Sequence, residues 1–317
     1  MKVTWAAPPF LPLRLGLDLH LDVKLDLDLE LLKATALDVA ILAGHALLYP
    51  SGIVQERLTA APTPQAPAPT PQALPLPDPD PDSEAAPAPG PRPGPDLRPG
   101  HTPVVLLHGF IDNRSVFVLL RRSLAQHGRR QVVPLNFSPL TRDIRRAAEL
   151  LGRRVEEICE RTGSRRVDIV GHSLGGLIAR YYAQRLGGDL RVRTLVTLGT
   201  PHAGTRVLPL ADAHPVMRQM RPGSAVIEEL SRPAPNCRTR FVSFWSDLDR
   251  AMDPLETARL DHPDLAARNV RVSGVGHLAL PLHPAVATGI RQALDAPDPA
   301  PDPAPDSDVG PAGLTVA

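Results

Sequence analysis

Ser173 is the first residue whose type and setting indicate chemistry. It is the central residue of Gly171-His172-Ser173-Leu174-Gly175, which fits the pattern G-x-S-x-G. The apolar run 167–170 precedes the motif and a helical pattern follows it, as a nucleophile elbow requires. The two glycines allow a turn so tight that a Cβ atom at either position would collide with a neighbouring strand or helix. Ser173 is therefore predicted to be a nucleophile, exposed at the N-terminus of a helix.

His277 is the predicted base, because a serine hydroxyl is a poor nucleophile until its proton is removed. The histidines that follow Ser173 are His202, His214, His262, His277 and His283. His277 ends the segment Ser273-Gly274-Val275-Gly276-His277, a flexible loop after the last predicted strand, from which an imidazole can reach the elbow. His202 is expected at the pocket rim. His262 and His283 each precede a proline and are expected in turns.

The acid that orients this histidine should follow the predicted strand 241–245. The loop after that strand holds Asp247, Asp249 and Asp253. Asp249 is the predicted acid and Asp247 is the alternative, while Asp253 is expected in a turn because Pro254 follows it. The resulting chain order is nucleophile, acid, base, which distinguishes this triad from other serine triads.

Two backbone N–H groups should stabilise the oxyanion of a tetrahedral intermediate. One is predicted to be that of Leu174, directly after the nucleophile. The other should come from the loop after the first strand, which reads His108-Gly109-Phe110. Because Gly109 allows the backbone to approach a substrate closely, the Phe110 N–H is the predicted second donor.

These motifs together resemble the bacterial triacylglycerol lipase and esterase branch of the α/β-hydrolases, and the actinobacterial members are especially similar. The resemblance is carried by three segments: 104–110, the elbow 171–176, and 197–205. It implies ester hydrolysis on Ser173, Asp249 and His277, with Phe110 and Leu174 as the oxyanion hole. It covers residues 102–294. The stretch 205–238 leaves room for only one or two short lid helices, which argues against interfacial activation and a long-chain preference.

The elements that must position these residues alternate between strand and helix. Strands are predicted at 104–107, 131–135, 167–170, 193–198, 240–245 and 269–272, and helices at 141–162, after the elbow, and at 285–294. Such alternation predicts a mostly parallel sheet with helices on both faces, the α/β-hydrolase fold with a short lid.

The rest of the chain divides by composition. Residues 1–58 contain an apolar stretch, 34–54, in which Asp38 is the only charged residue. This length suits either a membrane-associated helix or a helix docked on the catalytic domain. Residues 59–101 and 295–317 are rich in proline and predict a disordered linker and tail. A membrane, cell-envelope or secreted location is expected, although the first residues show no ordinary signal peptide.

Composition and charge exclude other classes. Two cysteines, Cys159 and Cys237, and the lack of CxxC or HExxH patterns argue against a disulfide framework, a metal or a cofactor. Residues 102–294 hold 28 arginines and 17 acidic residues, but the arginine pairs fit solvated helix faces, so no nucleic-acid partner is expected.

The expected partners are an acyl-ester substrate and a membrane surface; the oligomeric state is left open. A thioesterase or acyltransferase would use the same residues, and a non-catalytic membrane-tethered scaffold is the alternative from another class.

Overall fold

The computed structural model describes residues 29, 31–41, 43–44, 102–110, 112–129, 131–137, 142–207 and 214–297. The predicted linker 59–101, the tail beyond residue 297 and most of the predicted N-terminal segment lie outside these residues. The described part from Thr102 onward is built around one parallel sheet.

The sheet has six strands in the order β2-β1-β3-β4-β5-β6, and every pairing is parallel. The strands are β1 (Val104–Leu107), β2 (Val132–Leu135), β3 (Val167–His172), β4 (Val192–Leu198), β5 (Arg240–Ser246) and β6 (Ala266–Val272). The four strands β1, β3, β4 and β5 are almost wholly buried, because both faces of the sheet are covered. This confirms the predicted fold class.

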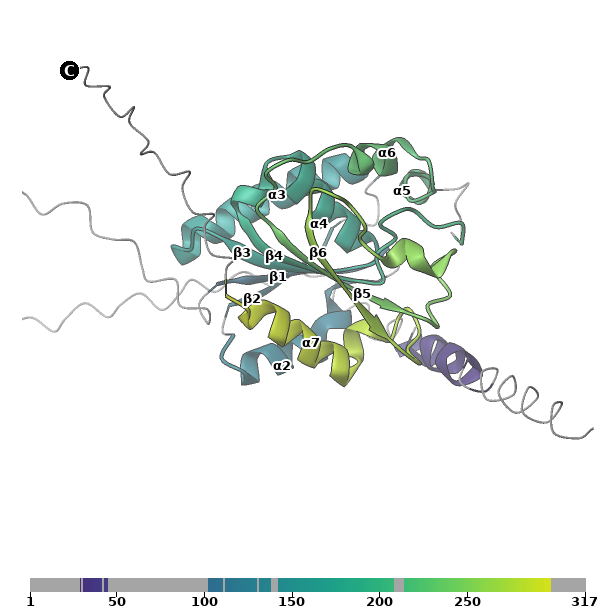
Figure 1. The fold of residues 1–317 in the computed structure, drawn as a ribbon. Coiled ribbons are helices and arrows are strands. Elements are labelled where there is room, and N and C mark those ends of the chain that lie inside the picture. Colours follow the sequence, from purple (N-terminus) through teal and green to yellow (C-terminus); the bar gives the residue numbers. More distant parts are fainter. Residues whose placement is uncertain are drawn as a thin grey trace, which may run out of the picture.

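Helices cover the sheet on both faces (Figure 1). One face carries α3 (Ile144–Thr162), α4 (Leu174–Arg185), α5 (Pro215–Gln219) and α6 (Ala225–Ser231); the other carries α2 (Val118–Gln126) and α7 (Pro284–Asp295). Short 3-10 turns are η1 (Arg114–Phe117), η2 (Gly188–Leu190), η3 (Leu255–Ala258) and η4 (Leu280–Leu282). Each face has its own apolar core.

Helix α3 shows how local sequence defines an element. The Asp143 side chain accepts from the N–H of Arg145 at 2.7 Å and so caps the first turn. Gly163 ends the helix in the left-handed conformation, φ 69°. Between them, apolar residues at helical spacing, among them Leu151 and Ile158, are buried against the sheet. Cys159 is buried on this stripe, and both it and Cys237 are free thiols.

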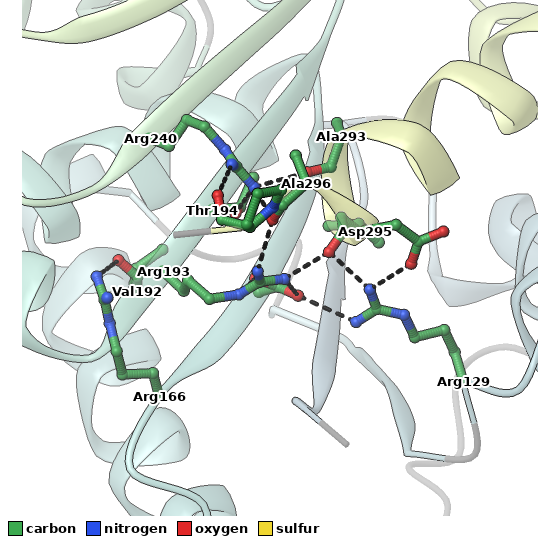
Figure 2. A network of polar contacts seen from close by, with 12 residues as sticks. Arg129, Arg166, Val192, Arg193, Thr194, Arg240, Ala293, Asp295 and Ala296 are labelled. Carbon is green, nitrogen blue, oxygen red and sulfur yellow. Dashed lines mark hydrogen bonds and ion pairs between the residues drawn. The ribbon is translucent and has the colours of Figure 1, made fainter. Parts of the chain in front are cut away.

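Three arginines hold the C-terminal end of α7 (Figure 2). Arg129 and Arg193 both donate to the Leu294 carbonyl, at 2.7 and 2.6 Å, and Arg240 donates to that of Ala293 at 2.7 Å. They satisfy carbonyls that a helix end leaves without intrahelical partners, and their charge complements the helix dipole. Asp168 of β3, fully buried, accepts from Arg193 at 2.6 Å and from Arg129 at 3.2 Å. The expectation that the arginine pairs lie on solvated faces is therefore wrong for Arg129.

The described residues 29, 31–41 and 43–44 are helical and lie beside the domain (purple in Figure 1). They overlap the predicted apolar stretch 34–54, of which residues 42 and 45–54 lie outside the described part. Ala34 is buried, and Ile41 packs against the core cluster that contains Val275 and Leu280. The described part of this helix thus contacts the domain. Within the described residues no helix is long and apolar enough to cross a membrane.

Candidate active site

Ser173 lies in the sharp turn between β3 and α4. Its φ of 51° and ψ of −119° are unusual for a residue with a side chain, as strained functional residues often are. A Cβ at Gly171 would lie 2.6 Å from Gly176, and one at Gly175 would lie 2.5 Å from the Leu107 carbonyl oxygen. Both positions therefore require glycine, because Gly171 lies against α4 and Gly175 lies against the end of β1.

Asp249 and His277 meet on the other side of the site. The Asp249 Oδ2 lies 2.9 Å from the His277 Nδ1, and the carboxylate is fully buried. Its other oxygen accepts from the Ala251 N–H at 3.0 Å, which fixes its orientation. Gly199 at the end of β4 makes room for this pair, because a Cβ there would lie 2.7 Å from Asp249 Oδ2 and 3.0 Å from His277 Nδ1. With Nδ1 occupied by the carboxylate, His277 Nε2 is left to act as a base.

Nearby carboxylates set the protonation of His277. Burial alone would lower the pKa of this imidazole, but Asp249, through charge and hydrogen bond, and then Asp112 and Asp38, through charge, raise the pKa above its usual value. An imidazolium at this position is therefore favoured, as is needed for a base that takes a proton from serine.

The competing aspartates and histidines are engaged elsewhere. Asp247 accepts from Arg271 at 2.9 Å and from the Gly274 N–H at 3.0 Å. The expectation for His202 is wrong: it is buried, with its Nε2 3.0 Å from the Thr197 hydroxyl, and it does not line the pocket. Burial followed by the charge of Arg180 brings the pKa of His202 well below its usual value, so this imidazole is neutral.

The predicted oxyanion donors flank the nucleophile. Leu174 is the first residue of α4, where backbone N–H groups have no partner within the helix. Phe110 follows β1 and lines the same pocket as Ser173, and a Cβ at Gly109 would lie 3.4 Å from the Ser173 Cβ. The β1 loop therefore lies within van der Waals reach of the serine.

A small apolar cavity connects these groups. Its volume is about 100 Å³, and Ser173 and His277 both line it. The remaining walls are largely apolar and include three methionines: Met217, Met220 and Met252. Met217 lies in α5, and Met220 is the residue that caps its C-terminal end. In the described part of the stretch 205–238, α5 and α6 are two short helices, so the predicted one or two short lid helices are borne out.

A protein-family model described as the alpha/beta hydrolase fold matches residues 102–223. Together with the parallel sheet, this match assigns the α/β-hydrolase fold to the part of the chain from residue 102 onward. Its sequence relatives include a triacylglycerol lipase of Vibrio cholerae serotype O1, 31% identical over 134 residues that make up 41% of this chain and 40% of the lipase. A triacylglycerol lipase of Pseudarthrobacter phenanthrenivorans is 33% identical over 112 residues, 32% of this chain and 34% of the lipase. The resemblance to bacterial lipases is thus confirmed.

Solved structures agree on the fold of the hydrolase domain. The mature form of a Bacillus licheniformis lipase superposes with a TM-score of 0.52 at 17% identity, over 64% of this chain and 95% of that one. At this identity the likeness concerns the fold alone. The matched region spans less than half the length of each of the two curated lipases.

The hydrolase domain also contains a second histidine–aspartate pair that the sequence analysis missed. His172 Nδ1 lies 3.0 Å from Asp112 Oδ2, and its Nε2 lies 3.2 Å from the His277 carbonyl oxygen. Its place inside the G-x-S-x-G motif was the only signal in the sequence. Asp112 had none, because 60 residues separate it from His172.

Proposed function

We propose that the domain hydrolyses carboxylic esters through an acyl-enzyme on Ser173. The observation that carries the proposal is that Ser173, strained at the elbow, and His277, paired with Asp249, line one cavity. His277 Nε2 takes the Ser173 proton as Oγ attacks the ester carbonyl, and the proton then passes to the leaving alcohol. Water, activated by the same imidazole, releases the acid and restores the serine.

The two N–H groups of Phe110 and Leu174 are assigned to the oxyanion that forms in both steps. Asp249 holds the imidazole in the productive tautomer and stabilises its positive charge. In this assignment the nucleophile, the base, the acid and both oxyanion donors are groups of this chain, and water is the second substrate.

The cavity supports a substrate with a short, apolar acyl chain. Its volume of about 100 Å³ is well below the ~300–1,000 Å³ of pockets for drug-sized ligands. The methionine side chains are unbranched and adaptable, so a somewhat longer chain can be accommodated by repacking. The named lipase relatives favour esters over thioesters as the substrate class.

The test combines covalent labelling with a panel of esters. A fluorophosphonate probe should label Ser173 in the folded chain, and nitrophenyl esters from C2 to C16 should give the highest kcat/KM at short chain length. An unlabelled serine would remove the enzymatic assignment and leave the non-catalytic scaffold. Preference for thioesters, or transfer to added alcohol over hydrolysis, would move the protein to the thioesterase or acyltransferase class.

We further propose that the helix 29–44 lies against a membrane surface. Leu32 and Val39, on the side away from the domain, are 65% and 61% exposed. Apolar residues on the free face of a helix suit the boundary between lipid headgroups and acyl chains. The full chain should bind neutral phosphatidylcholine vesicles in flotation, and a Leu32→Ser/Val39→Ser variant should not; equal binding by both would contradict this placement.

A further inference from the structure

Asp38 connects the N-terminal helix to the loop that carries His277. Its Oδ1 accepts from the N–H of Leu278 at 3.1 Å and from that of Ala279 at 3.2 Å. Gly276 allows this approach, because a Cβ at that position would lie 2.3 Å from the Asp38 carboxylate. Asp38, the only charged residue of the apolar stretch 34–54, thus binds the backbone of the two residues that follow the predicted catalytic base.

The helix is placed so that this contact is specific. Asp38 lies between Ala34 and Ile41 on one helical stripe, since residues three and four apart share a face. Ala34 is buried, and Ile41 packs against the apolar core cluster to which Val275, Ala279 and Leu280 belong, so the residues on either side of Asp38 on this stripe face the domain.

The loop is held from the opposite side by the elbow. His172 Nε2 contacts the His277 carbonyl oxygen, while Asp38 takes the two N–H groups that follow. The peptide groups around His277 are therefore fixed between the domain and the N-terminal helix. Hydrogen bonds to an ionised carboxylate are about twice as strong as neutral ones.

Charge gives Asp38 a second effect on His277. The groups that face this imidazole are Asp249 after β5, Asp112 after β1, His172 at the end of β3, and Asp38. Half-burial raises the pKa of the Asp38 carboxyl, and the charge of His277 lowers it again. The two groups therefore stabilise each other's charged forms.

We propose that Asp38 is a positioning residue for His277, so that the N-terminal helix completes the active site of the hydrolase domain. This inference rests on the proposed function. The family match begins only at residue 102, and neither it nor the relatives assign a role to this helix.

The test compares full-length Asp38→Ala, Asp38→Asn and Leu37→Ala variants on a short, soluble ester. Misplacing a catalytic group by about 1 Å costs roughly 100-fold, so Asp38→Ala should lower kcat by about 10- to 100-fold with KM nearly unchanged. Asp38→Asn keeps an oxygen that accepts from both N–H groups but removes the charge. It should lose less in kcat, and the acidic limb of its kcat/KM profile should move to lower pH. Leu37→Ala, a change at a residue that is 51% exposed on the same helix, should match the wild type.

Asp38→Ala and Asp38→Asn variants with wild-type kcat and pH profile would overturn the inference. A fall in thermal stability without the kcat loss or the pH shift would also overturn it, because the contact would then be merely structural. If fluorophosphonate labels wild-type Ser173, such results count against Asp38 alone. If it does not, the proposed function fails and this inference with it.

Discussion

Ser173 adopts a backbone conformation that few residues with a side chain tolerate, and the neighbouring glycines hold it there. Ser173→Ala should leave the fold intact because it removes a single oxygen atom. Loss of a serine nucleophile leaves only the catalysis of the oxyanion hole and of binding, so kcat should fall by about 10⁴-fold or more. Ester turnover and circular dichroism of the variant measure the two effects. Activity within tenfold of the wild type would exclude Ser173 as the nucleophile.

Asp249 and Asp247 are two residues apart but face different partners. Asp249→Asn should lower kcat by about 10⁴-fold, because the imidazole loses both its tautomer control and the charge that stabilises it. Asp247 instead contacts Arg271 and the Gly274 N–H, so Asp247→Asn should reduce kcat by less than about tenfold. Steady-state kinetics of both variants check the ranking, and the reverse order would show that the wrong aspartate has been assigned.

The pH dependence of activity should report His277. The base acts only when neutral, and the surrounding carboxylates raise the pKa of this imidazole above about 6.5. In the wild type, kcat/KM should therefore rise with pH through a midpoint above 6.5, and remain high at alkaline pH. A midpoint below 6.5 would contradict the charge arrangement around His277.

Residue types and chain order were enough to indicate the nucleophile, the base and the acid. Each lies in the loop or turn that follows a strand, where parallel sheets place functional groups. Their catalytic roles remain predictions, although the structure brings Asp249 and His277 into contact. His172, Asp112 and Asp38 escaped notice because their contacts join segments between 60 and 241 residues apart, which no local pattern encodes.

At the C-terminal end of α7, the carboxylate of Asp168 is fully buried and pairs with both Arg129 and Arg193. Asp168→Ala would leave the charges of Arg129 and Arg193 buried without their shared partner. Removing one member of a buried pair costs about 3–5 kcal/mol, and this variant should lose a comparable free energy of unfolding. Urea denaturation measures it. Asp261→Ala, which breaks the exposed contact with Arg259, is the matched control and should cost less than about 1 kcal/mol.

The elements that the sequence indicated best were those with a clear apolar pattern. Helix α2 was missed because its apolar residues do not form one stripe: Val118 and Leu119 are exposed, while Leu120 and Leu124 are buried. Strand β6 begins three residues before the predicted position, at Ala266. It lies at the edge of the sheet, and its exposed residues weaken the apolar signal.

On the scale of the whole molecule, the N-terminal helix was the element whose place the sequence could not determine. It carries apolar residues on both its docked and its exposed sides, and this composition suits a lipid surface as well as a protein surface. In the structure, Asp38 of this helix binds a loop more than 230 residues away. Such a contact depends on tertiary structure.

Gly276→Ala should separate the helix from the domain. The added Cβ would meet the Asp38 carboxylate, so amide hydrogen exchange in residues 29–44 should accelerate while the sheet stays protected. Gly44→Ala is the control, because a Cβ there meets nothing within 4 Å. Unchanged exchange in the Gly276→Ala variant would show that the helix does not depend on this contact.

Because the helix and the His277 loop belong to one chain, their encounter is governed by an effective concentration and not by the concentration of protein. Even a weak intrinsic affinity keeps such a pair associated, and dilution does not separate it. A single proteolytic cut between residues 45 and 101 would leave both partners intact but make their association bimolecular. Activity after such a cut should fall on dilution and return on adding a peptide that spans residues 29–44.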